Sequence, residues 1–128
     1  MIANLGTEEI LATDFGKGRK HDFQLFKDSR SALSGQTCVV ADAGYQGLAD
    51  LHRNSQTPAK KTKLEPLSQD QKASNRALSR KRILIENIIR KIKIFRILSE
   101  RYRNRRRRFG LRFNLITAIY NLELKKVP

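Results

Sequence analysis

The longest regular hydrophobic pattern in the chain covers residues 75–95, NRALSRKRILIENIIRKIKIF, which contain neither Gly nor Pro. Apolar positions recur there at the period of an α-helix, so the pattern predicts an amphipathic helix. Ser68 and Gln71 form a capping-box pattern that predicts where this helix opens. The apolar stripe consists of Ile85, Ile88, Ile89 and Ile92, with Leu84 and Phe95 at its edge. A second face carries one carboxylate among cations: Ser79, Arg82, Glu86, Arg90 and Lys93.

The beginning of the chain alternates short apolar runs with turn residues. This pattern predicts strands at residues 2–5 and 9–15, joined by a turn at Gly6-Thr7. Asp22 is predicted to cap a helix that runs to about residue 31, because an Asp side chain accepts the unpaired amide hydrogens of a first helical turn.

Residues 37–41, TCVVA, predict a fully buried strand that ends at Asp42. Cys38 is the single cysteine and is expected to be a buried thiol within that strand. A turn at residues 44–47 should lead into a helix near Leu48. Because sites in open α/β sheets gather at the carboxyl ends of strands, Asp42 is well placed to hold a metal ion. A simple strand-end cap is the alternative interpretation of Asp42.

The later segments read as a linker and a closing helix. Residues 53–66 are polar and contain two prolines, which predicts an exposed linker without a helix. His52 is expected on the surface without a partner. Residues 111–122 predict a helix that packs on the sheet through Phe113, Ile116, Ile119 and Tyr120.

The charge of the chain is strongly positive and unevenly distributed. The formal net charge is +15, and residues 76–112 hold 15 Lys and Arg against Glu86 and Glu100, a local balance of +13. Residues 1–75 are nearly neutral, with 10 basic and 9 acidic side chains. A one-sided basic block with interspersed aromatic residues indicates a polyanion partner, most simply nucleic acid.

Glu86, the lone carboxylate on the basic helix face, has two interpretations. It can form a surface ion pair with Arg82 four positions earlier, worth a few tenths of a kcal/mol. It can also be a metal-ligand carboxylate set into a phosphate-binding face. Spacing alone leaves both open.

Several stretches, in order, resemble the DDE transposases of bacterial insertion sequences, and the insertion-sequence-five group in particular. Arg82-x3-Glu86-x6-Lys93 is similar to the signature of the last catalytic helix in that family, although Ser79 replaces the usual Tyr. The other similar stretches are HDFQLFKDS, VVADAGYQG, the Lys60-Lys61 segment after Pro58, and KIFRILSERYRNRRRRFGLRFNLITAIYNLEL.

The resemblance implies an α/β fold, a ribonuclease-H-like mixed sheet flanked by helices. It also implies that the first strand of this sheet, with the first catalytic Asp, lies upstream of Met1 and is missing here. Residues 1–124 would then form a partial transposase catalytic domain, followed by a tail at residues 125–128. Asp14 is in the wrong strand to replace the missing Asp and is expected to be a surface carboxylate.

The implied chemistry is two-metal phosphoryl transfer at DNA phosphodiesters, with Mg²⁺ as the expected ion and Mn²⁺ as an alternative. Asp42 and Glu86 match two of the three catalytic, metal-binding carboxylates and are expected to converge. His21 is either a loop imidazole that bonds nearby backbone or a group supporting the metal ligands. The expected DNA-contacting cations are Arg82, Arg90, Lys93, Arg101, Arg103, Arg105, Arg106, Arg107 and Arg108.

Two functions of different class follow from these expectations. The first is a DDE endonuclease fragment that cuts and transfers DNA strands, partnered by the upstream transposase segment and homo-oligomeric when complete. The second is a basic DNA-binding remnant without catalysis. No apolar run reaches the roughly 18–20 residues of a membrane span, and the single cysteine fits a cytoplasmic location.

Overall fold

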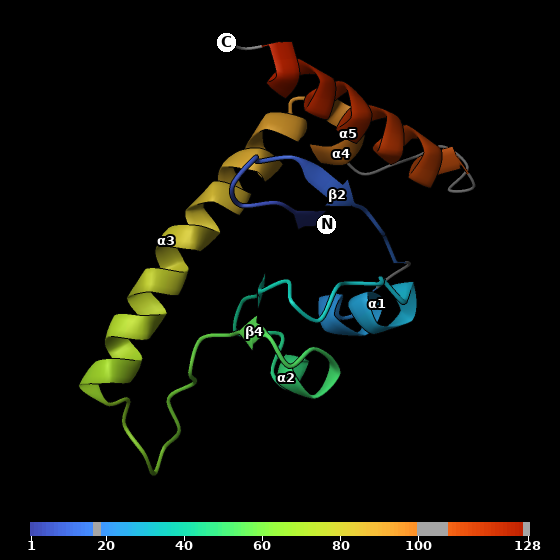
Figure 1. Ribbon diagram of the computed structural model, residues 1–128. Helices are drawn as coiled ribbons and strands as arrows, with labels where there is room; N and C mark the ends of the chain where they lie inside the picture. Colours follow the sequence, from blue (N-terminus) through green and yellow to red (C-terminus); the bar gives the residue numbers. More distant parts are fainter. Residues whose placement is uncertain (17–18, 100–107, 127–128) are drawn as a thin grey trace. The chain divides into compact units, whose positions relative to one another are not determined.

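The computed structural model describes residues 1–16, 19–99 and 108–126 (Figure 1). The described residues form a mixed α/β chain, so the predicted α/β class is confirmed. Two compact units divide the chain, Met1–Phe15 with Ile83–Pro128 as unit 1 and Gly16–Arg82 as unit 2. The elements are β1 (Ile2–Ala3), β2 (Ile10–Ala12), α1 (Asp22–Ser29), β3 (Val39–Val40), α2 (Leu48–Leu51), β4 (Ser55–Gln56), α3 (Gln69–Ile92), α4 (Arg96–Ser99) and α5 (Phe109–Lys126).

Within the described ranges, the strands pair as two separate two-stranded sheets. In unit 1, β1 and β2 are antiparallel, with Ile2 opposite Ala12. The side chain of Asn4 accepts hydrogen bonds from the amides of Gly6 (2.8 Å) and Thr7 (3.1 Å), which fixes the predicted turn. Both strands are shorter than the sequence pattern predicted.

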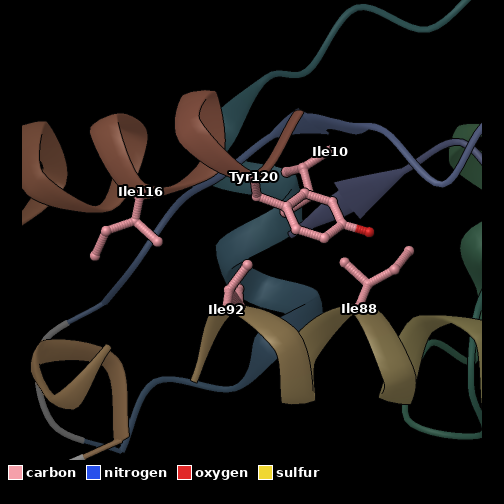
Figure 2. Packing of buried hydrophobic residues seen from close by; sticks show 5 residues of the cluster. All are labelled: Ile10, Ile88, Ile92, Ile116 and Tyr120. Carbon is pink, nitrogen blue, oxygen red and sulfur yellow. The ribbon is translucent and has the colours of Figure 1, made fainter. Parts of the chain in front are cut away.

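The core of unit 1 is an isoleucine-rich cluster built from β2, α3 and α5 (Figure 2). Ile88 is completely buried and Ile92 is 4% exposed, which confirms the predicted apolar stripe of α3. The cluster of buried side chains consists of Ile10, Ile88, Ile92, Ile116 and Tyr120. Because its members come from three elements far apart in sequence, this cluster holds unit 1 together.

Polar contacts tie α5 to the β1–β2 hairpin within the same unit. The side-chain amide of Asn121 accepts a hydrogen bond from the Ile10 amide (2.9 Å) and donates one to the Ile10 carbonyl (2.8 Å). The Tyr120 hydroxyl donates to the Glu8 carbonyl (3.2 Å). Glu8 has a left-handed backbone, φ 60°, which a non-glycine residue adopts at a cost and which this contact supports.

The capping box of α3 is confirmed in both directions. The Gln71 amide donates to the Ser68 hydroxyl (3.1 Å), and the Ser68 amide donates to the Gln71 side chain (2.9 Å). The helix ends at Ile92 instead of reaching Phe95, so the predicted end was wrong. The chain turns after Ile92 and continues as α4, whose Ile97 and Leu98 pack against the isoleucine cluster.

The closing helix α5 is longer than predicted and buries a different set of residues. It extends to Lys126, and its buried residues are Ile116, Thr117 and Tyr120. The prediction for Ile119 was wrong, because this side chain is 37% exposed. Phe113 is partly buried against the cluster, as expected.

In unit 2, β3 and β4 form a parallel pair, with Val39 opposite Ser55 and Val40 opposite Gln56. Residues 55–56 were predicted to be linker, because their polar side chains give no strand pattern. Both valines are half-buried and Cys38 is exposed, so the predictions of a fully buried strand and a buried thiol were wrong. A strand pair this short has too little surface to enclose its side chains.

Two histidines of unit 2 bond backbone groups, as one of the two interpretations of His21 expected. His21, not Asp22, caps α1, since His21 Nδ1 accepts the Phe23 amide hydrogen (3.3 Å). His52 was expected to be an unpartnered surface residue, but its Nε2 lies 2.6 Å from the Thr37 carbonyl oxygen. That contact links the end of α2 to Thr37, two residues before β3.

We expect Ile88→Ala to lower the free energy of unfolding by about 2–4 kcal/mol, because it leaves a cavity in a fully buried site. Denaturant unfolding followed by circular dichroism measures the change. The control is Ile83→Ala in the same helix, which is 54% exposed and should change stability by less than about 1 kcal/mol. Equal losses for the two variants would contradict the assignment of the core.

Candidate active site

Asp42 begins a tight turn directly after β3. Its Oδ1 accepts a hydrogen bond from the Gly44 amide (2.8 Å), and its backbone carbonyl accepts one from the Tyr45 amide (3.1 Å). The Ala41 amide bonds the Gln56 carbonyl (3.0 Å), so the β3–β4 pairing reaches the residue before Asp42. The backbone on both sides of this carboxylate is therefore fixed, which is the strand-end position that the sequence predicted.

An open hollow of about 380 Å³ lies beside Asp42 within unit 2. Gly44 has no side chain to separate the two residues beside it. A Cβ at this position would lie 3.1 Å from Asp42 Oδ1 and 3.7 Å from His21 Cε1. His21 and Asp42 therefore approach each other across a glycine. The residues that line the hollow are Arg19, Lys20, His21, Asp22, Asp42, Gly44 and Tyr45.

Tyr45 connects the hollow to α1. Its ring lies 5.5 Å from the ring of Phe23 and 6.3 Å from that of Phe26, measured between centroids. Burial raises the pKa of the Tyr45 phenol, and the carboxylates of Asp22 and Asp42 raise it further. Both carboxylates therefore act on the same phenol.

Asp22 is the site residue that the sequence analysis missed. The pattern assigned it to helix capping, but His21 performs that role and Asp22 lines the hollow with Asp42. The available signal was the His-Asp pair inside the stretch that resembles the transposases. Lys20, also in the lining, forms an ion pair with Asp28.

Glu86 lies on the exposed side of α3, as do Arg82 and Arg90. Lys93 is exposed and directly follows the last residue of α3, and its amide still bonds the Ile89 carbonyl (3.0 Å) as in a further helical turn. Asp42 belongs to unit 2 and Glu86 to unit 1, and their convergence stays a prediction. Asp14 is exposed and accepts the Phe15 amide hydrogen (2.8 Å), as expected of a surface carboxylate.

The predicted site also included a metal-binding group and a set of arginines. Among the residues that the structure describes, no group of three or more His, Cys, Asp or Glu side chains could hold a metal ion. Arg108 is exposed at the start of α5. The predicted DNA contacts that lie outside the described residues are Arg101, Arg103, Arg105, Arg106 and Arg107.

Comparison with known proteins identifies the class. Residues 1–122 match the family described as Transposase DDE domain, and the chain belongs to this family. It is also similar to the probable transposase for insertion sequence element IS702 of Microchaete diplosiphon, with 51% identity over 124 residues. That match covers 97% of this chain but 45% of the relative, so the chain spans less than half the relative's length. No solved structure matches.

The family assignment confirms the resemblance that the motifs indicated. In the described part of the chain, no helix has the length and apolar character needed to cross a bilayer.

We expect Asp42→Asn to lower the pKa of Tyr45, because the substitution removes one of the charges that raise it while keeping an acceptor for the Gly44 amide. The unfolded tyrosine ionises near pH 10, so folding is destabilised as the pH rises past that value, and the variant should lessen this loss. Titration of isotope-labelled tyrosine rings by NMR measures the pKa.

Asp50→Asn is the matched control for this titration. Asp50 belongs to α2, and its carboxylate is not among the charges that raise the pKa of Tyr45. An equal shift in both variants would show that Asp42 does not act on the phenol specifically.

Proposed function

We propose that this chain is the downstream part of an insertion-sequence transposase catalytic domain, and that it contributes to divalent-metal-dependent cleavage and transfer of DNA strands. The observation that carries the proposal is the match of residues 1–122 to the Transposase DDE domain. The position of Asp42 supports it, because this carboxylate follows a strand and lines a hollow with a second carboxylate, Asp22.

The strand pairing supports a missing neighbour in unit 1. On β2, the amide and carbonyl of Ile10 are already bonded to Asn121. The outer edge of β1 is therefore the edge at which a further strand can add. A two-stranded sheet is marginal by itself, and an added strand would enlarge it.

The same argument applies to unit 2. β3 is apolar and leads to Asp42, whereas β4 consists of the polar pair Ser55 and Gln56, which suits an outer edge. We propose that upstream strands complete both pairs. The result would be a ribonuclease-H-like mixed sheet flanked by helices, with residues 1–124 as its downstream part.

The available donors fit a hard divalent cation in chemical type. Carboxylate oxygens suit Mg²⁺ and Mn²⁺, and Asp42 and Glu86 are the ligands we propose. When bound, a pair of such ions generates a nucleophile from water and stabilises the leaving oxygen. The Gly44 amide holds one oxygen of Asp42, which orients the carboxylate. The upstream strand would bring the third carboxylate, the one expected to lie between the ions.

The basic residues are proposed to hold the DNA. Arg82, Arg90 and Lys93 are exposed in the neighbourhood of Glu86 in sequence, and the arginine run at residues 101–108 adds forked donors suited to phosphate oxygens. We further propose that the complete protein works as a homo-oligomer in the cytoplasm. The alternative of a DNA-binding remnant without catalysis has no specific observation in its favour.

We expect the 128-residue chain alone to leave DNA uncut in Mg²⁺ or Mn²⁺, because two adjacent ions repel each other strongly without a carboxylate between them. Fusion to the unmatched part of the Microchaete diplosiphon relative should restore nicking of a supercoiled plasmid. In that fusion, Asp42→Ala or Glu86→Ala should abolish nicking and metal binding, measured by calorimetry.

The control for the fusion is Asp70→Ala, which removes an exposed carboxylate from the first turn of α3. It should leave nicking unchanged. Nicking by the chain alone that disappears on Asp14→Ala would show that Asp14 is the first carboxylate and that the strand assignment is wrong.

We expect binding of the chain to duplex DNA to weaken steeply with salt, with a slope of roughly −0.9 in log K against log salt for each phosphate contact. Replacing Arg105, Arg106, Arg107 and Arg108 with Ala should flatten that slope by several units. Fluorescence anisotropy over a salt series measures it.

A charge-matched variant provides the comparison. Alanine at Lys27, Arg30, Arg53 and Lys72 removes the same number of cations from outside the arginine run. If this variant flattens the slope as much as the first, overall charge and not the arginine run determines binding.

A further inference from the structure

Helix α5 has an apolar face on each of two sides. One side packs into the isoleucine cluster of unit 1 through Ile116 and Tyr120. The other side carries four large apolar residues that are exposed to solvent, which we name the outer stripe. Its members are Leu111 (71% exposed), Leu115 (60%), Ile119 (37%) and Leu122 (55%).

The outer stripe is continuous along the helix. Its members are spaced by four, four and three residues, so at about 100° per residue they fall within roughly one quarter of the helix circumference. A helix that is apolar on both sides is ordinarily covered on both sides. Exposed apolar residues in a contiguous patch mark an interaction site, whereas isolated ones need no explanation.

The charges around the outer stripe argue against a second copy of this chain as its occupant. Arg108 precedes α5 and Arg112 lies in its first turn, whereas Lys125 and Lys126 lie at its end, where Lys125 also forms an ion pair with Glu9 (3.5 Å). Two α5 helices paired through this stripe would bring cations against cations in either relative direction, with Glu123 as the one acidic side chain of the helix. A neutral or acidic segment avoids this repulsion.

We propose that the outer stripe of α5 docks an apolar segment with an acidic rim from the part of the transposase outside this chain. This inference rests on the proposed function, in which an upstream segment completes the domain. The length of the relative indicates where this segment comes from, because the match covers 45% of the relative and the larger part of that protein has no counterpart here. The stripe gives that part a second point of attachment besides the edges of β1 and β3.

The test measures binding of the full chain to the unmatched part of the Microchaete diplosiphon relative, expressed separately, by calorimetry without DNA or metal. Leu115→Glu should raise Kd by roughly tenfold or more, since burying a leucine side chain is worth over a factor of ten in binding. Leu122→Glu should act in the same direction. Leu51→Glu is the matched control, because Leu51 is 56% exposed and belongs to α2, and its Kd should be unchanged.

Three results would overturn the proposal. The first is a Kd that Leu115→Glu leaves unchanged, or an absence of binding by the wild-type chain. The second is self-association of the chain that Leu115→Glu abolishes, which would make a second copy the occupant. The third is protection of Leu115 from hydroxyl-radical oxidation in the monomeric chain by itself, which would make residues 16–82 the occupant.

The experiment distinguishes a loss of docking from a loss of folding and from a loss of nicking activity. Circular dichroism verifies that each variant retains its helices, and an exposed site should tolerate the substitution. Asp42→Ala and Glu86→Ala should bind the relative's segment with unchanged Kd. Docking without metal-dependent nicking would therefore defeat the proposed function and leave this inference standing.

Discussion

Burial of Ile88 is the interaction on which unit 1 depends. Its side chain packs where β2, α3 and α5 meet, and it is fully removed from solvent. The β1–β2 hairpin is too short to fold alone, so it persists because α3 and α5 give it an apolar surface to cover. The Asn121 side chain then bonds the amide and carbonyl of Ile10, so these backbone groups at the edge of β2 have hydrogen-bond partners. These hydrogen bonds close the β2 side of the hairpin, so among the described residues the outer edge of β1 is the open one.

Both strand pairs are very short, although one is antiparallel and the other is parallel. In unit 1 the pairing is antiparallel and closed on the β2 side by Asn121, whereas in unit 2 it is parallel and formed by residues far apart in sequence. Parallel strands are ordinarily covered on both faces and belong to larger sheets. A strand pair of two residues with half-buried valines does not meet that condition, and this observation motivates the upstream strands proposed above.

Sequence predicted those features that depend on local chemistry. The stripe of Ile88 and Ile92 and the capping box at Ser68 follow from helical periodicity and from side-chain bonds to nearby backbone. Two of the errors fall where distant residues decide. Nothing near β4 shows that it pairs with Val39, and nothing near Cys38 shows that its strand is left uncovered. The Asp22 error is local, because His21 accepts the amide hydrogen that Asp22 was expected to accept. Asp42 was predicted as a metal ligand because strand end and family motif agreed, and that role stays a prediction.

The signs of charge around Asp42 explain how a protein of net charge +15 could still attract a metal ion. Arg19 and Lys20 line the hollow, and taken alone they would repel a divalent cation. Lys20, however, forms an ion pair with Asp28, and two carboxylates, Asp22 and Asp42, also line the hollow. Under the proposed function, the carboxylates would hold the metal ion and the arginines would hold the DNA, so the two ligands would not compete for the same side chains. Such separation serves phosphoryl transfer, because the phosphate must approach the metal without displacing it.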